Sequence, residues 1–242
     1  MRLRKESDMS ITSIKENIEK VIRLKDEAAL KSGRDKGDVL LCAVTKTRSA
    51  DEINEAIRAG ITDIGENKVQ EIIDKYEDVE PVKWHMIGHL QTNKVKYIID
   101  KVDLIHSVDS MRLAEEIDRR AGQCGKIMDI LIQVNSAMEE SKFGIAAGET
   151  GRLINEILEN CPNIRIKGLM CMAPFEVNPE DAAVYFAEVR ELFIKYSKEI
   201  KHDRLEFSTL SMGMSGDFET AIKEGSNLIR VGTAIFGERN YV

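Results

Sequence analysis

Lys46 is the first residue whose type and position suggest chemistry, because it ends the apolar run VLLCAVTK (39–46). Burying an ammonium group without a partner costs free energy, so a lysine at this place needs an explanation. It either leaves the strand and reaches solvent with its charged end, or it lies in an apolar cavity. In a cavity the amine loses hydration, becomes a nucleophile and can form Schiff bases with aldehydes.

Two segments near the end of the chain could bind a phosphate group. LSMGMSGDFETA contains glycines for a tight turn and the hydroxyl of Ser215, just before a helix that we expect Asp217 to cap. RVGTAIFGE contains Gly232, which permits close approach of the backbone, and Thr233 with its N–H and hydroxyl. Clustered backbone N–H groups at helix starts stabilise anions. Glycine and serine are also common in ordinary turns, so each segment alone is weak evidence.

Arg230 interrupts NLIRVGTA (227–234), which is otherwise an apolar strand. Its guanidinium is always charged, and inside a sheet or barrel it needs a partner. That partner is either an acidic side chain or the ring nitrogen of a bound cofactor. Lys46, the two loops and Arg230 together suit pyridoxal 5′-phosphate (PLP), the commonest aldehyde cofactor, because it needs an amine, a phosphate site and a partner for its pyridine nitrogen.

These residues must be positioned by the elements around them. From residue 39 onward, short apolar runs alternate with amphipathic stretches of helical spacing. The predicted strands are 39–46, 63–66, 84–88, 103–108, 129–135, 164–172, 204–211 and 227–234. The predicted helices are 10–33, 50–59, 67–77, 91–100, 110–122, 148–160, 179–200 and 217–224.

Eight such strand–helix units predict an α/β fold, a single-domain (β/α)₈ TIM barrel with an extra N-terminal helix. An open, doubly wound sheet is the alternative, and eight strands suit it less well. We expect one PLP-binding domain over residues 1–242, with residues 1–9 as a flexible N-terminal extension. In a barrel the strands' carboxyl ends surround the active-site mouth, and Lys46 and the two loops would meet there.

Composition narrows the class of protein. The formal charge of −7 and the pI near 5.3 argue against a nucleic-acid-binding protein, which would need a basic face. No apolar stretch is long enough to span a membrane. MRLRKESDMS has no apolar segment behind its basic residues and is therefore not a secretory signal. We expect a cytoplasmic protein.

The cysteines and histidines give weaker signals. Three of the four cysteines sit within or beside apolar runs and there is no CxxC pair, which favours core thiols in a cytoplasmic protein over a disulfide or zinc framework; the four are Cys42, Cys124, Cys161 and Cys171. His85 and His89 are four residues apart, but no third ligand is evident nearby. Packing or hydrogen bonding at the barrel rim is the better interpretation of both histidines.

Several segments in this order resemble the YggS/PROSC family of pyridoxal phosphate homeostasis proteins, over about residues 10–240. They are AVTKT (43–47), DIGENKVQE (63–71), WHMIGHLQTNK (84–94), HSVDS (106–110), KFGI (142–145), GLMCMAP (168–174), LSMGMSGDFETAI (210–222) and IRVGTAIFG (229–237). The combination is specific, although no single segment is. The resemblance implies a barrel similar to the N-terminal domain of bacterial alanine racemase and to that of eukaryotic ornithine decarboxylase.

The resemblance also implies roles for particular residues. Lys46 would hold PLP as an aldimine, and Arg230 would face the pyridine nitrogen. Asn67 would lie beside the ring, and Met172 would pack near the cofactor, in a stretch where the family varies. The phosphate would be held by Ser215, Gly232 and Thr233.

The sequence argues partly against catalysis. Racemases of this fold take a second base, a tyrosine, from a second β domain and a partner subunit, whereas this chain ends at Val242, directly after the eighth unit. Arg230 cannot accept a proton, so a ring nitrogen facing it would stay neutral and the ring would stabilise a carbanion poorly. We therefore expect a protein of PLP (vitamin B6) homeostasis that buffers or delivers the cofactor without clear catalysis.

Two other functions stay open. One is a weak PLP-dependent amino-acid racemase with Lys46 as its base, and the other is a barrel that binds a different phosphorylated small molecule. The expected partners are PLP and PLP-dependent apoenzymes as recipients, with no nucleic acid or membrane, and the expected state is a monomer or weak dimer. HLQTNK (89–94) is either a docking surface or an ordinary helix start.

Overall fold

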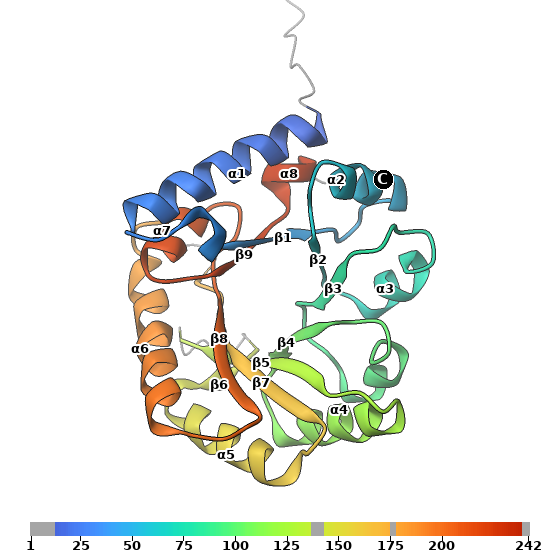
Figure 1. Cartoon of the computed structure of the whole chain (residues 1–242), viewed down its shortest axis with the longest axis vertical. Coiled ribbons are helices and arrows are strands. Elements are labelled where there is room, and N and C mark those ends of the chain that lie inside the picture. The colour runs from blue at the N-terminus through green and yellow to red at the C-terminus, as the bar shows by residue number, and fades with distance from the viewer. Residues whose placement is uncertain (1–12, 137–142, 175–177, 239–242) are drawn as a thin grey trace, which may run out of the picture.

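Eight parallel strands form a closed barrel in the computed structural model, which describes residues 13–136, 143–174 and 178–238 (Figure 1). Around the barrel the strands follow the order β1-β2-β3-β4-β5-β7-β8-β9, and β9 pairs with β1. A short extra strand, β6, pairs with β5. The strands are β1 (Leu40–Val44), β2 (Asp63–Glu66), β3 (Lys83–Met86), β4 (Leu104–Val108), β5 (Met128–Asn135), β6 (Ile145–Ala146), β7 (Ile164–Met170), β8 (Leu205–Ser211) and β9 (Leu228–Val231).

The pairing of β9 with β1 confirms the predicted barrel and excludes the open sheet, whose edge strands would stay unpaired. The extension predicted over residues 1–9 lies outside the described residues. Helices surround the strands in a ring (Figure 1). They are α1 (Ile14–Lys31), α2 (Ala50–Arg58), α3 (Val69–Lys75), α4 (Met111–Gln123), α5 (Thr150–Asn160), α6 (Ala183–Glu199), α7 (Phe218–Lys223) and α8 (Thr233–Phe236), with 3₁₀ helices η1 (Lys36–Asp38), η2 (Thr92–Tyr97) and η3 (Ala147–Glu149).

Helix α1 is the predicted extra N-terminal helix. Its start is fixed by a capping box, in which Ser13 and Glu16 each accept a hydrogen bond from the other's backbone N–H. Its apolar residues, including the fully buried Ile18, pack on the helices beside it, α2, α7 and α8. This helix therefore covers the part of the barrel where the first and last strands meet (Figure 1).

Several predicted boundaries were wrong by a few residues. The stretch predicted as a helix over 91–100 forms only the 3₁₀ helix η2, and the helix predicted from 179 begins at Ala183 after a turn. The last strand ends at Val231 because the chain turns at Gly232 into the four-residue helix α8. Asp217 stands at the start of α7, but its carboxylate accepts the N–H of Met214 and not one from the helix.

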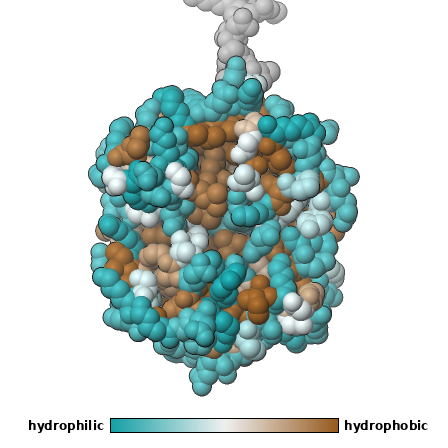
Figure 2. All heavy atoms as spheres, viewed as in Figure 1, coloured by the Kyte–Doolittle hydropathy of each residue, from teal (hydrophilic) through white to brown (hydrophobic). Residues whose placement is uncertain are grey.

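The apolar core has two parts. Most of it lies between the strands and the helices, where a fully buried isoleucine or leucine contributes roughly 2 to 3 kcal/mol. A smaller cluster comprises Cys42, Leu104, Leu131, Met170 and Leu228. In the view of Figure 1, apolar surface gathers toward the upper middle of the molecule and hydrophilic residues dominate its margin (Figure 2).

Within the residues that the structure describes, no helix has both the length and the apolar character of a membrane span. The described thiols are free, and three of the four, Cys42, Cys161 and Cys171, are buried as predicted. Cys124 is exposed after α4.

Gly168 in β7 allows two strands to approach closely where the register shifts. Its φ is +145°, and a Cβ atom at this position would lie 1.9 Å from the carbonyl oxygen of Thr209 in β8. We expect Gly168→Ala to lower the free energy of unfolding by about 3 kcal/mol or more, measured by urea denaturation. Gly148→Ala is the control, because no atom lies within 4 Å of its Cβ position. Equal stability of the two variants would contradict this role of Gly168.

Candidate functional site

Lys46 lies just beyond the end of β1. The strand ends at Val44, two residues before the predicted end, but the Thr45 N–H still bonds the Gly65 carbonyl of β2 at 3.0 Å. This bond extends the pairing of β1 with β2 to Thr45. Lys46 follows in a turn, which the Arg48 N–H closes on the Thr45 carbonyl at 3.0 Å. Lys46 is partly buried.

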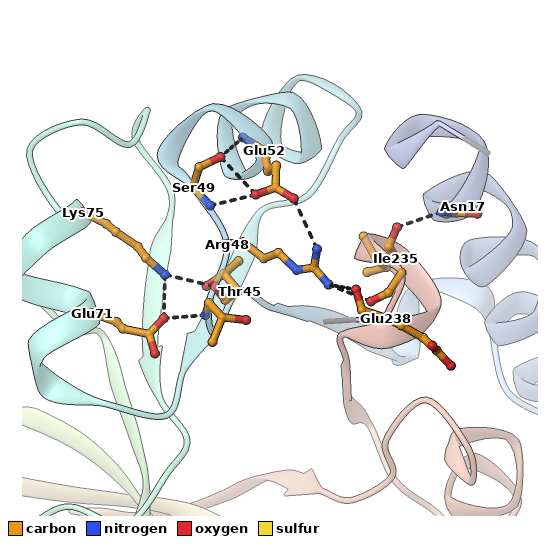
Figure 3. Close-up of polar contacts among 11 residues, drawn as sticks. Asn17, Thr45, Arg48, Ser49, Glu52, Glu71, Lys75, Ile235 and Glu238 are labelled. Carbon is orange, nitrogen blue, oxygen red and sulfur yellow. Dashed lines mark hydrogen bonds and ion pairs between the residues drawn. The ribbon is translucent and has the colours of Figure 1, made fainter. Parts of the chain in front are cut away.

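Thr45, the residue before the lysine, is anchored on the other side of the wall. Its hydroxyl donates to Glu66 Oε1 at 2.7 Å, and its carbonyl accepts from Lys75 Nζ at 3.1 Å. Lys75 comes from α3 and also bonds Glu66 Oε1 at 2.9 Å. Figure 3 shows the lysine reaching from α3 toward Thr45.

Thr47, the residue after the lysine, is held by the same helix. Its backbone has a φ of +63°, a left-handed conformation that β-branched residues rarely adopt. Its N–H donates to Glu71 Oε2 at 2.5 Å, and that carboxylate is paired with Lys75 at 2.8 Å. Glu66, Glu71 and Lys75, called here the acid–lysine cluster, thus fix the backbone on both sides of Lys46.

Burial and pairing act differently on the two carboxyl groups of the acid–lysine cluster. Burial raises the pKa of Glu66 above its usual value, although Lys75 and Thr45 oppose the shift. Burial also opposes ionisation of Glu71, but the hydrogen bonds from Lys75 and the Thr47 N–H outweigh it and hold the pKa of Glu71 below its usual value. Glu66 Oε2 is buried without a hydrogen-bond partner in the described part of the chain.

The two predicted phosphate segments meet as expected. Ser215 Oγ accepts the N–H of Gly232 at 3.2 Å and that of Ala234 at 3.4 Å, so the loop after β8 contacts the first turn of α8. Gly232 is also close to β1, because a Cβ there would lie 3.2 Å from the Val44 carbonyl oxygen. Thr233 is exposed at the start of α8. Backbone N–H groups and hydroxyls therefore gather next to the end of β1.

Arg48 ties α8 to the segment that carries the lysine. Its guanidinium donates to the carbonyls of Gly237 at 2.6 Å and Glu238 at 3.2 Å (Figure 3). From the other side, Asn17 of α1 donates to the carbonyl of Ile235 at 2.9 Å. Hydrogen bonds therefore connect the helix that follows the N–H groups around Ser215 with the segment that carries Lys46.

Arg230 is 3% exposed and paired with Cys42 of β1 in the barrel ladder. One of its terminal nitrogens donates to Ser211 Oγ, and the other donates to the Cys171 carbonyl at 2.9 Å. Burial lowers the pKa of Arg230, and Cys171 raises it. No ion pair among the described residues involves Arg230, which leaves its remaining N–H groups for other acceptors.

Asn67 and Met172 lie on loops at the same end of the barrel. Asn67 is partly buried after β2, and its backbone meets Gly88, where a Cβ would lie 2.3 Å from the Asn67 carbonyl oxygen. Met172 follows β7 and packs against the small apolar cluster near the barrel axis. The two histidines proposed as weak metal candidates are separate, because His85 is buried and His89 is exposed and stacked on Phe143.

Comparison with known proteins identifies the family of this chain. Residues 15–240 match the family described as "Alanine racemase, N-terminal domain". The pyridoxal phosphate homeostasis protein of Aquifex aeolicus (strain VF5) is 41% identical over 228 residues, which cover 93% of this chain and 98% of that protein. The chain belongs to the YggS/PROSC family of pyridoxal phosphate homeostasis proteins. The family expected from the sequence motifs is therefore confirmed.

Solved structures similar to the YggS/PROSC chain include a family member and, at low sequence identity, a racemase. PipY of Synechococcus elongatus PCC7942, in a structure with PLP bound, has a TM-score of 0.77 and 33% identity and covers 93% of this chain and 100% of PipY. An alanine racemase of Clostridium difficile 630 has a TM-score of 0.73 and 16% identity, over 95% of this chain but 57% of the racemase. The racemase shares the barrel fold.

Sequence reasoning missed the acid–lysine cluster and Arg48 of this family member. Glu66 is a charged residue at the end of the strand DIGE, and Lys46 is a charged residue after VLLCAV. A charged residue at the end of an apolar strand was therefore the signal that could have indicated Glu66. Lys75 carried no signal, because a lysine on a helix is usually solvated. Only the packing of α3 beside the end of β1 shows its role.

Glu71→Gln tests the acid–lysine cluster. The pKa of Glu71 is lowered in the folded protein, so its ionised form stabilises the fold above the unfolded pKa of about 4.3, and this contribution is lost as pH falls through the lower folded pKa. We expect the variant to be less stable by about 1 to 2 kcal/mol at neutral pH, with the difference vanishing below about pH 3. Urea denaturation at several pH values measures both.

Glu77→Gln is the matched control, because Glu77 is exposed at the end of the same helical segment. It should leave the stability unchanged at each pH. A Glu71→Gln deficit that persists undiminished in acid would show that Glu71 acts by packing and not by its charge.

Proposed function

We propose that this chain binds pyridoxal 5′-phosphate and serves in PLP homeostasis by holding the cofactor and delivering it to PLP-dependent apoenzymes. One observation carries the proposal: Lys46, the N–H groups around Ser215 and the buried Arg230 gather around the paired strands β1 and β9. The homeostasis relatives and the PLP-containing structure of PipY support it.

The residues present fit the cofactor. The N–H groups of Gly232 and Ala234 donate hydrogen bonds to Ser215 Oγ in this structure. They are uncharged donors suited to a phosphate, and Thr233 with its hydroxyl is exposed beside them. Lys46, which carries the amine, lies between Thr45 and Thr47, and both threonines are held by hydrogen bonds to glutamates. Bound PLP supplies an aldehyde that can join covalently to an amine, and an electron-withdrawing ring.

Each residue then has a role in binding. Lys46 attaches the cofactor, and Ser215, Gly232 and Thr233 hold its phosphate. Arg230 donates a hydrogen bond to the ring nitrogen, Asn67 contacts the ring from the β2 loop, and Met172 packs against it from the β7 loop. Because a guanidinium offers no proton acceptor, Arg230 keeps the ring nitrogen unprotonated.

The same feature is our reason for proposing a carrier and not an enzyme. A ring with an unprotonated nitrogen withdraws electrons weakly, so it gives little stabilisation to a carbanion. The relatives carry the name of homeostasis proteins, and the barrel corresponds to 57% of the racemase with which it aligns. We further propose that the chain works in the cytoplasm as one domain, as a monomer or weak dimer.

Lys46→Ala tests the attachment site. The purified chain should be yellow, and the variant should lose the visible absorbance of covalently attached PLP, because no other amine would be placed to form the bond. Absorbance spectra of both proteins after addition of PLP and removal of the excess measure this. Lys68→Ala, which removes an exposed lysine of the neighbouring β2 loop, should keep the full absorbance. Loss of absorbance in Lys68→Ala instead would overturn the assignment of Lys46.

A weak amino-acid racemase is the second candidate function, favoured by the shared fold with alanine racemase. Incubation of the PLP-loaded protein with single L-amino acids, followed by chiral analysis, decides between the two. We expect no turnover above that of free PLP. Turnover that exceeds it and disappears in Lys46→Ala would replace the carrier function. Mass spectrometry of the ligand that copurifies would reveal a different phosphorylated molecule, the third candidate.

A further inference from the structure

A continuous chain of hydrogen bonds crosses the inside of the barrel below Arg230. Arg230 donates to Ser211 Oγ, which lies 3.0 Å from His106 Nδ1. His106 Nε2 lies 3.0 Å from His85 Nδ1, and His85 Nε2 lies 3.1 Å from Asp63 Oδ1. These five residues, called here the lumen relay, come from β9, β8, β4, β3 and β2, and none is more than 3% exposed.

The arginine determines the direction of every hydrogen bond in the lumen relay. A guanidinium only donates, so Ser211 Oγ accepts from it and has its own O–H left to donate. The acceptor available to that O–H is His106 Nδ1. His106 therefore carries its proton on Nε2 and donates it to His85 Nδ1. His85 in turn carries its proton on Nε2 and donates it to Asp63 Oδ1.

Burial supports this assignment. Burial lowers the pKa of His106 well below its usual value, which keeps this imidazole neutral. Hydrogen bonds from His85 and Thr62 hold the pKa of Asp63 below its usual value despite burial, and the charge of Lys83 adds to the effect. The opposite direction would leave the buried Ser211 O–H without an acceptor among the described residues, which costs about 1 to 3 kcal/mol.

We propose that the lumen relay is a one-way chain of donors from Arg230 to Asp63, in which both imidazoles are neutral and carry their proton on Nε2. Asp63, His85, His106 and Ser211 are then positioning residues for Arg230. The lumen relay connects the guanidinium of Arg230 with the carboxylate of Asp63 across the barrel, and the two groups form no direct ion pair. The guanidinium keeps its remaining N–H groups for a ligand, and this last point rests on the proposed function.

The acidic end of the lumen relay faces the opposite opening of the barrel. Asp63 and His85 line a cavity of about 440 Å³, together with Leu40, Lys83 and Leu228, the first residues of three strands. The lumen relay therefore connects the amino-terminal end of the barrel with the level of Arg230. Its carboxylate balances the buried guanidinium from a position that solvent can approach.

The direction of the lumen relay can be read directly by NMR. The chain contains four histidines, and His89 and His202 are exposed, so they serve as internal references in protein labelled with ¹⁵N-histidine. We expect His85 and His106 to show the neutral Nε2–H pattern in ¹H–¹⁵N spectra near neutral pH, as the directions of the hydrogen bonds require. An Nδ1–H tautomer at His106, or an imidazolium at His85 near neutral pH, would overturn the proposal.

Two variants separate positioning from folding. Asp63→Asn keeps an acceptor oxygen and should preserve both tautomers, whereas Ser211→Ala removes the link between Arg230 and His106 and should alter the His106 signals. In PLP-loaded protein, Ser211→Ala should release the cofactor roughly tenfold faster, because a hydrogen bond to a charged group is lost. Ser208→Ala, at an exposed position of the same strand, is the control.

The two parts of the proposal fail separately. The spectra of the unloaded chain test the direction of the lumen relay whether or not PLP binds. If the tautomers are as expected and PLP does not bind, the proposed function fails and the lumen relay stands. If PLP binds and Ser211→Ala releases it no faster than Ser208→Ala, the positioning role is refuted.

Discussion

The pairing of the last strand with the first is the constraint on which the site depends. β9 and β1 are parallel neighbours with Cys42 opposite Arg230, so the segments that follow each strand leave the barrel side by side. One carries Lys46, and the other carries Gly232 and α8. Residues almost the whole chain apart thereby become neighbours, and Arg48 can reach the carbonyl of Gly237. An open sheet would separate the amine from the N–H groups by its full width.

The buried charged side chains discussed here are tolerated within an apolar barrel because each forms hydrogen bonds with neighbouring groups. Removing one partner of a buried charge costs more than the pair contributes, since the remaining group stays desolvated. Inside the wall, Arg230 is connected to the carboxylate of Asp63 through Ser211, His106 and His85. Outside the wall, Lys75 joins two carboxylates and the backbone of Thr45. These two networks hold Arg230 and Lys46 from opposite sides of the wall.

Holding a cofactor and using it for catalysis place different demands on the same barrel. Catalysis requires interactions that are stronger in the transition state than in the ground state, and proton transfer requires a positioned acid or base. Retention requires only an attachment point, an anion site and a partner for the ring. The described site contains several hydrogen-bond donors, from backbone N–H groups to Arg230, which fit the retention proposed above. The barrel it shares with alanine racemase therefore does not by itself imply racemisation.

The sequence by itself determined the barrel, because eight apolar runs alternating with helical stretches can bury their surface in few other ways. It also indicated Lys46, Arg230 and the two glycine-containing loops, since each breaks a local pattern that burial or regular structure would favour. The exact limits of strands and helices could not be predicted, as at Asp217, whose carboxylate bonds Met214 instead of capping α7. Local rules do not include such competition between backbone N–H donors for one carboxylate.

Only the tertiary structure decided which polar residues support the site. His85, His106 and Ser211 lie in separate strands, and nothing in their local sequence shows that they form one hydrogen-bonded chain. Lys75 resembles any solvated lysine of a helix until α3 packs beside the end of β1. Local patterns are set by neighbours in the chain, whereas hydrogen-bond partners are set by the register and closure of the barrel. These are properties of the whole fold.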